Sequence, residues 1–327
     1  MDTSDKEIVF DEHGNCNHCN DFIERADKRA YKGERSDKRF VEVVSKIKGT
    51  GKNKYGYDCL IGVSGGVDSS YAAYIAKKNG LSPLLVHMDN GWNSELAVSN
   101  IERIVKRLDI DLHTEVLDWE EFRELQKALF RASVGNVEMA TDHAINATLF
   151  RLARQFEIRH ILSGSNLNTE GIVQHGGWAH DNKDWINIRD INRRHGTRRL
   201  VTYPRLTPFS FAWAILFRGV RYLPVLNFFE YDKLEAMELL ERELGWREYG
   251  RKHGESLFTR FFQEYYLPEK FKVDKRRSHF SSLICAGQMT REEALVEMEK
   301  PMFKDGEKER LIEFACKKLE FSEDEWA

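Results

Sequence analysis

Residues 59–74 contain the feature that most limits how this chain can fold: an apolar run, a glycine-serine loop and the start of a helix. The loop reads Ser-Gly-Gly-Val-Asp-Ser over residues 64–69. Gly65 and Gly66 lack a Cβ, so the backbone can turn sharply there and approach a ligand closely. Backbone N–H groups at the start of a helix attract anions. The order strand, loop, helix therefore predicts a phosphate-binding loop in an α/β fold.

Polar side chains in this loop fit the same purpose. Ser64, Ser69 and Ser70 add hydroxyl donors, and Asp68 offers the carboxylate that Mg²⁺ on a phosphate prefers. The loop lacks the Gly-Lys-Ser/Thr of the Walker pattern, and it is not Gly-x-Gly-x-x-Gly. It resembles the pyrophosphate loop of PP-loop ATP pyrophosphatases such as GMP synthetase and asparagine synthetase, which implies cleavage of ATP between its α- and β-phosphates. The alternative is an ordinary glycine turn in a parallel sheet.

Apolar strand candidates alternate with amphipathic helices after the loop. The expected strands cover residues 58–63, 81–88, 112–117, 160–163 and 199–203. A helix is expected over residues 94–108, and Gly80 is placed as a helix C-cap. This alternation predicts an α/β fold with a parallel, Rossmann-like sheet of the PP-loop type. The expected parts are a Cys-containing N-terminal segment (1–50), a PP-loop domain (51–231) and a mostly α C-terminal region (232–327).

Two further loops should reach the ligand, because ligands of parallel sheets bind beyond the carboxyl ends of the strands. Asp89 and Trp92 follow the second strand and are predicted to contact adenine and ribose; a capping Asp with a surface Trp is the alternative. Gly164, Asn166 and Glu170 follow the fourth strand and resemble the stretch that closes the far side of the nucleotide in PP-loop enzymes. Capping of a helix N-terminus is the alternative there.

Charged groups elsewhere supply candidates for catalysis and phosphate binding. Asp142 and His143, near the start of a long helix, are placed to orient a nucleophile or collect a proton, although a solvated helix end explains them as well. Cationic clusters at residues 252–256 and 275–279 would attract a polyphosphate or sugar nucleotide, while charge runs usually form solvated faces. Lys275 and Arg276 are the predicted phosphate contacts. The predicted catalytic set is Asp68, Ser69, Asp142, His143, Glu255 and Lys275.

Cysteine content and charge narrow the class of protein. The net charge of −3 gives no sign of nucleic-acid binding. Five cysteines at uneven spacing do not form a disulfide framework, and without a signal peptide a cytoplasmic protein is expected. Cys16 and Cys19 form a Cys-x-x-Cys that is half of a zinc site, or else two free thiols. Cys285 and Cys316 are too isolated in the sequence to complete it.

One long apolar stretch, residues 208–231, raises the question of membrane insertion. Arg218, Arg221 and Pro224 interrupt it, so a spanning helix is not expected. A buried helix is the favoured interpretation, and a surface for a partner or a membrane face is the alternative.

Motifs distributed over nearly the whole chain resemble the N-acetyl sugar amidotransferases of bacterial surface-polysaccharide pathways. They lie at residues 1–5, 10–19, 64–70, 245–249, 252–256 and 274–288. Family members usually carry a further Cys-x-x-Cys just before the Met-Asp-Thr-Ser-Asp stretch, whereas this sequence starts at that methionine. The sequence therefore contains two of the four cysteines expected for the zinc site, and the zinc assignment rests on these two.

The resemblance implies a reaction on a nucleotide-linked sugar. AMP is transferred to the acetamido oxygen, ammonia replaces that oxygen to give an acetamidino group, and AMP and pyrophosphate are released. The loop residues Ser64, Gly65, Gly66, Asp68 and Ser69 would neutralise the pyrophosphate together with Mg²⁺, and Lys275 and Arg276 would add contacts.

The resemblance also implies partners, because no glutaminase motif is found in this sequence. Ammonia would come from a separate glutaminase with a cyclase-like subunit, similar to those of imidazole glycerol phosphate synthase, and residues 209–229 would be a docking surface. Two rival functions are a tRNA-modifying PP-loop enzyme, of the thiolating or lysidine-forming kind, and a non-catalytic nucleotide sensor. The acidic net charge and the lack of cysteines near residues 141–146 oppose the first rival.

Overall fold

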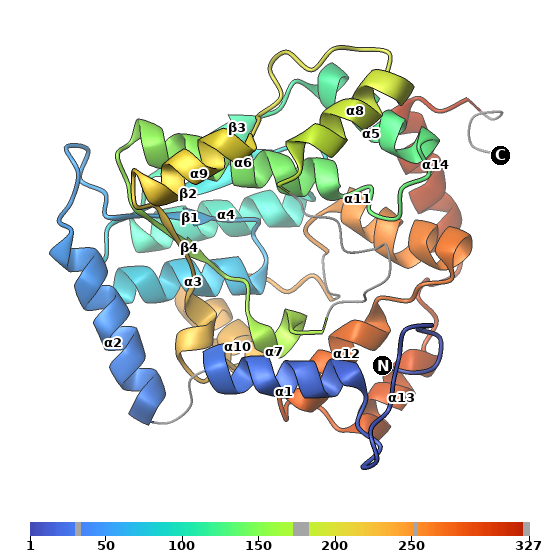
Figure 1. The fold of residues 1–327 in the computed structure, drawn as a ribbon, viewed down its shortest axis with the longest axis horizontal. Coiled ribbons are helices and arrows are strands. Elements are labelled where there is room, and N and C mark those ends of the chain that lie inside the picture. The colour runs from blue at the N-terminus through green and yellow to red at the C-terminus, as the bar shows by residue number, and fades with distance from the viewer. Residues whose placement is uncertain (30–33, 173–182, 251–253, 323–327) are drawn as a thin grey trace.

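Five short strands form one sheet at the centre of the computed structural model, which describes residues 1–29, 34–172, 183–250 and 254–322 (Figure 1). The strands are β1 (Cys59–Gly62), β2 (Pro83–Asp89), β3 (Leu112–Val116), β4 (His160–Ser163) and β5 (Arg221–Pro224). Their order is β3-β2-β1-β4-β5, and all neighbours are parallel. The predicted α/β fold with a parallel sheet is confirmed. The strand order changes direction between β1 and β4, which is where such sheets open a crevice for ligands.

Helices make up most of the remaining described structure. The α-helices of the first part of the chain are α1 (Asn17–Arg29), α2 (Glu34–Gly49), α3 (Val67–Lys78), α4 (Glu95–Leu108), α5 (Trp119–Arg131), α6 (Met139–Gln155), α7 (Leu167–Glu170), α8 (Trp185–His195) and α9 (Pro208–Leu216). The second part contains the 3₁₀-helix η1 (Val225–Phe228), α10 (Lys233–Leu244), α11 (Leu257–Arg260), the π-helix η2 (Phe261–Phe271), α12 (Arg276–Cys285), α13 (Arg291–Glu299) and α14 (Glu307–Leu319). The mostly helical C-terminal region is thereby confirmed.

The N-terminal segment lies beside the C-terminal region. Helix α1 packs on α12, as Figure 1 shows. Arg277 of α12 forms an ion pair with Asp2 at 2.7 Å, and Arg25 of α1 donates to the carbonyl of Gly171 at 2.6 Å. Helix α10 packs on α3 and α4. The division of the chain at residues 50 and 231 stays a prediction.

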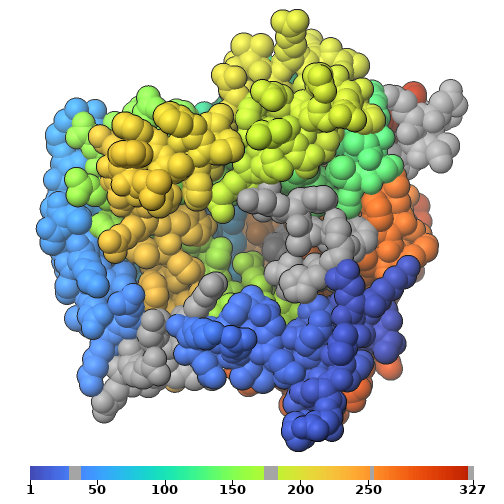
Figure 2. All heavy atoms as spheres, in the orientation of Figure 1, coloured from blue at the N-terminus to red at the C-terminus, as the bar shows by residue number. Residues whose placement is uncertain are grey.

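The apolar stretch around α9 is not the buried helix that was expected. Thr207 caps the helix by accepting the N–H of Ser210, Pro208 occupies its first turn, and Gly219 lies beyond its end with a φ of +67°. Only Ala214 of α9 is fully buried, and several large side chains face outward, where Figure 2 shows α9 as an amber patch at the upper left. No helix in the described part of the chain is long and apolar enough to cross a bilayer.

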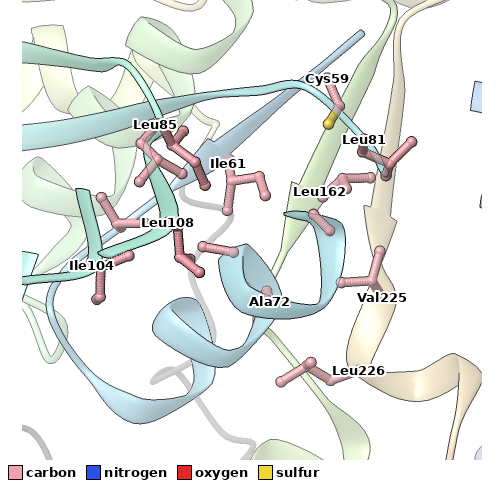
Figure 3. Packing of buried hydrophobic residues seen from close by; sticks show 14 of the residues in the cluster. Cys59, Ile61, Ala72, Leu81, Leu85, Ile104, Leu108, Leu162, Val225 and Leu226 are labelled. Atoms are coloured by element: carbon pink, nitrogen blue, oxygen red, sulfur yellow. The ribbon is translucent and has the colours of Figure 1, made fainter. Parts of the chain in front are cut away.

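Side chains of the sheet alternate between two apolar layers. Ile61 and Leu85 face α3 and α4, where Ala72 and Ile104 pack against them (Figure 3). Their strand neighbours Leu60, Leu84 and Val86 belong to the opposite layer, with Leu149 and Leu152 of α6. Both faces of the sheet are covered, as parallel sheets require. The loops at the strand ends therefore rest on a rigid platform.

The prediction of a fifth strand at residues 199–203 is wrong. The fifth strand of the sheet is β5, which lies at the edge next to β4. The backbone N–H groups of Thr202 and Tyr203 donate to the carboxylate of Glu121 at 2.9 to 3.1 Å, so they do not join a strand ladder. The other four strands and the helix predicted over residues 94–108 are confirmed. Gly80 has a φ of +72° just after α3, as a C-cap glycine should.

Candidate functional site

A cavity of about 920 Å³ opens at the carboxyl ends of β1, β2 and β4. The phosphate loop, the end of β4 and one face of α6 contribute to its walls, together with residues from the C-terminal helices. Its volume lies near the upper end of the range for small-molecule sites, which is about 300–1,000 Å³. It has room for a nucleotide and part of a second substrate.

The phosphate loop has the backbone that its glycines predict. Gly65 has a φ of +85°, and a Cβ there would lie 2.6 Å from the carbonyl oxygen of Ala97. Gly66 precedes the first turn of α3 with an extended backbone, so the free N–H groups of that turn start beside the loop. The Ser69 hydroxyl donates to the Gly66 carbonyl at 3.1 Å and accepts the N–H of Ser64 at 3.3 Å. These contacts close the loop on itself.

Two aromatic side chains hold the loop from outside. The indole N–H of Trp246 and the hydroxyl of Tyr249 both donate to the Gly65 carbonyl at 2.8 Å. Asn100 of α4 donates to the Tyr249 hydroxyl at 3.2 Å and to the carbonyl of Arg247 at 2.8 Å. The carbonyl oxygen of Gly65 thus accepts two hydrogen bonds. These bonds hold it away from a bound phosphate, which a carbonyl oxygen would repel. The sequence motif at residues 245–249 was noted, but this role was not predicted.

Asp68, the predicted Mg²⁺ ligand, lines the cavity from the first turn of α3. Its Oδ1 accepts a hydrogen bond from the hydroxyl of Tyr231. Burial raises the pKa of Tyr231, and the charge of Asp68 adds to this effect, so the phenol stays protonated and donating. The carboxylate is oriented beside the place where the loop would hold phosphate. Such a single carboxylate plus phosphate oxygens is a usual donor set for Mg²⁺.

Glu255 and Lys275 bring the C-terminal region to the cavity. A Cβ on Gly66 would lie 3.2 Å from Oε1 of Glu255, so this carboxylate lies over the loop. The backbone of Glu255 accepts the N–H of Ser94 at 2.9 Å, and Ser256 pairs with Asn93 in an isolated antiparallel bridge. Lys275 and the neighbouring residues Ser278 and His279 line another part of the wall. Residues 251–253, which include part of the cationic cluster predicted at 252–256, lie outside the described structure.

One face of α6 presents polar groups to the cavity. Glu138, Asp142 and Asn146 are spaced by four residues, so they lie on one side of the helix, and all three line the cavity. Glu138 accepts a hydrogen bond from Gln263 at 3.2 Å, and the Asn146 amide donates to the Asp142 carbonyl at 2.8 Å. Asp142 is therefore placed where the prediction needs it.

His143 is turned away from this face. It is fully buried, its Nε2 accepts the backbone N–H of Leu206 at 3.1 Å, and its ring stacks near Trp185 and Tyr203. It does not line the cavity, because its position on α6 is one residue beyond the cavity face. The structure assigns it a packing role, and the catalytic role predicted for it has no geometric support.

Of the other predicted residues, two support the site without lining it and two line the cavity. Ser70 is buried and donates to the Gly66 carbonyl at 2.7 Å, and Asn166 caps α7 by accepting the N–H of Thr169. Gly164 and Glu170 do line the cavity. A Cβ on Gly164 would lie 2.6 to 2.7 Å from the backbone of residues 68 and 69, so glycine permits β4 to pack against the loop.

Three predicted contacts point elsewhere. Trp92 is buried in the second apolar cluster and donates from its indole to Gln126 at 2.9 Å. Asp89 accepts the N–H of Gly91 and lies at a small separate pocket. Arg276 pairs with Asp274 at 2.8 Å and donates to the carbonyl of Lys300 at 2.8 Å. None of the three lines the large cavity.

The cysteine prediction is changed by the fold. The thiols of Cys16 and Cys19 are 3.2 Å apart, and Cys19 also forms a hydrogen bond with Cys285, which the sequence had left isolated. This hydrogen bond and burial raise the pKa of Cys19. Within the described residues no group of three or more His, Cys, Asp or Glu side chains is arranged to hold a metal ion, so zinc has no structural support.

One family model matches the C-terminal part of the chain. Residues 255–327 match the sequence model of the family described as LPS biosynthesis protein WbpG-like, C-terminal domain. No curated protein matches the chain. Residues 255–327 are thus similar to a domain of lipopolysaccharide biosynthesis proteins, which agrees with the resemblance based on motifs.

Solved structures give distant likenesses. The chain is similar to NMN synthetase from Francisella tularensis, with 15% identity over 66% of this chain and 95% of that chain and a TM-score of 0.33. It is similar to NAD⁺ synthetase from Burkholderia pseudomallei, with 13% identity over 70% and 99% and a TM-score of 0.32. A predicted subunit of a tRNA methyltransferase from Methanocaldococcus jannaschii gives 16% identity over 55% and 74% and a TM-score of 0.32. Likenesses at these scores carry no inference about substrate.

Proposed function

We propose that the chain is a cytoplasmic, ATP-dependent amidotransferase acting on a nucleotide-linked acetamido sugar, because residues 255–327 match the WbpG-like model of lipopolysaccharide biosynthesis proteins. The enzyme would adenylate the acetamido oxygen and replace it with nitrogen from ammonia. The products would be an acetamidino sugar, AMP and pyrophosphate.

The observation that carries the proposal is the shared cavity. A loop built for phosphate forms one side, and Glu255, Lys275 and His279 of the matching domain form another. A nucleotide held by the loop would therefore place its α-phosphate beside groups that belong to the lipopolysaccharide domain. This arrangement suits transfer from ATP to a second substrate better than simple nucleotide storage.

The first step activates a poor electrophile. The amide oxygen attacks the α-phosphorus of ATP, a new P–O bond forms, the bond to the β-phosphate breaks, and pyrophosphate leaves. Loop N–H groups and the hydroxyls of Ser64 and Ser69 would bind the leaving pyrophosphate. Mg²⁺ held by Asp68 would neutralise part of its charge, and Lys275 would add a cation from the C-terminal domain.

The second step needs ammonia and a proton acceptor. Ammonia attacks the activated carbon, the C–O bond breaks, and AMP leaves with the original oxygen. Asp142 on the cavity face of α6 would take the proton that the incoming nitrogen loses. The ammonia would be delivered by a separate glutaminase with a cyclase-like subunit.

The direct test is product analysis. Purified protein with ATP, Mg²⁺, an ammonium salt and a panel of acetamido sugar nucleotides should yield AMP and pyrophosphate. Mass spectrometry should show one sugar nucleotide lighter by the difference between O and NH. Formation of ADP and orthophosphate with the turned-over sugar would overturn the proposal.

Two neighbouring cations provide a matched pair of variants. Lys275→Ala should lower kcat/KM by at least about tenfold with little change in thermal stability, because Lys275 lines the cavity. Arg276→Ala should lower stability with a smaller effect on kcat/KM, because its guanidinium binds Asp274 and a carbonyl outside the cavity. The reverse pattern would contradict the assignment of phosphate contacts.

A further inference from the structure

Helix α9 carries an outward face of large apolar side chains. The exposed fractions are 77% for Phe209, 43% for Trp213, 75% for Leu216 and 70% for Phe217. The three rings are four residues apart and form a stacked ladder, with centroids 6.4 Å apart between Phe209 and Trp213 and 4.7 Å apart between Trp213 and Phe217. Figure 2 shows α9 at the surface as one continuous patch.

The opposite side of α9 is apolar as well. Ala214 is buried, and Phe211 and Ile215 pack against the apolar layer that contains Leu149 and Leu152 of α6. This inner face accounts for the attachment of α9 to the domain. Phe209, Leu216 and Phe217 are mostly exposed, and the outer ladder presents to water the kind of side chains that soluble surfaces seldom group together.

The segment that contains this patch is rich in arginine. Residues 191–229 contain seven arginines (193, 194, 198, 199, 205, 218 and 221) and no Asp or Glu. Arg193 and Arg194 pair with Asp190, and Arg198 pairs with Glu120. Arg205, Arg218 and Arg221 are exposed and form no ion pair within the described ranges. Arg218 directly follows the last ring of the ladder, and Arg221 begins the edge strand β5.

We propose that this surface, made of the α9 ladder and Arg205, Arg218 and Arg221, binds the anionic face of a phospholipid bilayer. Aromatic and leucine side chains of a short surface helix enter the boundary between headgroups and acyl chains, and arginines pair with lipid phosphates. A protein partner normally offers charges of both signs, whereas a lipid surface rich in phosphate offers one. Arg205, Arg218 and Arg221, which have no ion pair within the described ranges, therefore complement a membrane. This proposal is independent of the reaction in the cavity.

The test is vesicle flotation of the full chain at moderate salt. Wild-type protein should float with vesicles of phosphatidylcholine containing about one third phosphatidylglycerol and should not float with phosphatidylcholine alone. The double variant Phe209→Ser/Phe217→Ser should lower the partition coefficient at least tenfold. Val296→Ser, at an exposed apolar residue of α13, is the matched control and should behave as wild type.

Charge variants separate the electrostatic part. Arg218→Gln/Arg221→Gln should weaken binding to anionic vesicles and reduce its salt dependence, whereas Arg291→Gln on α13 should not. Thermal unfolding of each variant checks the fold, and Phe209→Ser alone replaces the double variant if that one unfolds. Equal partition of wild type and the ladder variants would overturn the proposal. So would equal binding to neutral vesicles, or a ladder variant whose only effect is on self-association in sedimentation.

Discussion

Alanine at position 65 would test how the phosphate loop is held. Gly65 has a φ of +85°, and its added Cβ would lie 2.6 Å from the carbonyl oxygen of Ala97 and 2.9 Å from the hydroxyl oxygen of Tyr249. The first of these atoms belongs to the backbone of α4, so it cannot give way as a flexible side chain would. The loop must shift or the helix must.

The expected cost has two parts. A left-handed backbone costs a residue with a Cβ about 1–2 kcal/mol, and forcing a methyl group into a filled space costs about 1–3 kcal/mol. Gly65→Ala should therefore lower the free energy of unfolding by about 2–5 kcal/mol. Gly51→Ala serves as the reference, because Gly51 has a φ of +72° and no atom within 4 Å of the built Cβ. It should lose only the first part, about 1–2 kcal/mol.

The third member of the series is Gly66→Ala. Gly66 has a φ of −68°, and its Cβ would meet only side-chain atoms, the nearest being Oε1 of Glu255 at 3.2 Å and Oγ of Ser64 at 3.3 Å. Its loss should stay within about 1 kcal/mol. Each substitution also lowers the entropy of the unfolded chain similarly, so the differences between variants report the folded state.

Urea unfolding of the three variants gives the answer. The order of stability should be Gly66→Ala, then Gly51→Ala, then Gly65→Ala. If the variants at positions 65 and 51 unfold at the same urea concentration, the backbone of Ala97 does not confine the loop and the reasoning fails.

Three further perturbations follow from the same geometry. Trp246→Phe removes one donor to the Gly65 carbonyl and should cost about 1 kcal/mol of stability and weaken ATP binding in titration calorimetry; unchanged ATP affinity would show that the donor does not shape the loop. Tyr231→Phe leaves the buried side of Asp68 without its donor and should cost about 1–3 kcal/mol in thermal unfolding, with a raised Mg²⁺ requirement for pyrophosphate release. Burial lowers the pKa of His87 and of His160 in the folded protein. In the unfolded chain both histidines titrate near a pKa of about 6.5, so the unfolded state binds more protons below that pH. The free energy of unfolding should therefore fall as the pH drops through that value. A stability that rises on acidification from pH 7 would contradict this sign.

The sequence predicted the site best where one continuous segment forms it. Gly65 and Asp68 lie in a short segment whose strand, turn and helix are local, so the phosphate loop could be recognised before any contact was known. Asp142, chosen as a carboxylate beside an imidazole, lines the cavity, and its catalytic role stays a prediction. Its neighbour His143 was assigned wrongly, since a shift of one residue on a helix turns the side chain by about 100° into the core.

Residues brought together from distant segments could not be predicted in this way. Trp92 and Trp246 are both buried and both donate from the indole N–H, yet Trp92 donates to Gln126 and Trp246 donates to the Gly65 carbonyl of the phosphate loop. Cys285 meets Cys19 only because α12 packs on α1. The sequence also does not show which face of α9 packs against the apolar layer, because both faces carry large apolar side chains.

The short bridge between Asn93 and Ser256 has a kinetic consequence. Together with the bonds from the N–H of Ser94 to the Glu255 carbonyl and from the N–H of Leu257 to the Trp92 carbonyl, it ties the start of the segment that matches the WbpG-like model to the segment leaving β2. The two sides of the cavity are thus joined in the absence of a ligand. In the reaction proposed above, neither substrate would have to assemble the binding site of the other, so ATP and the sugar nucleotide should add in random order.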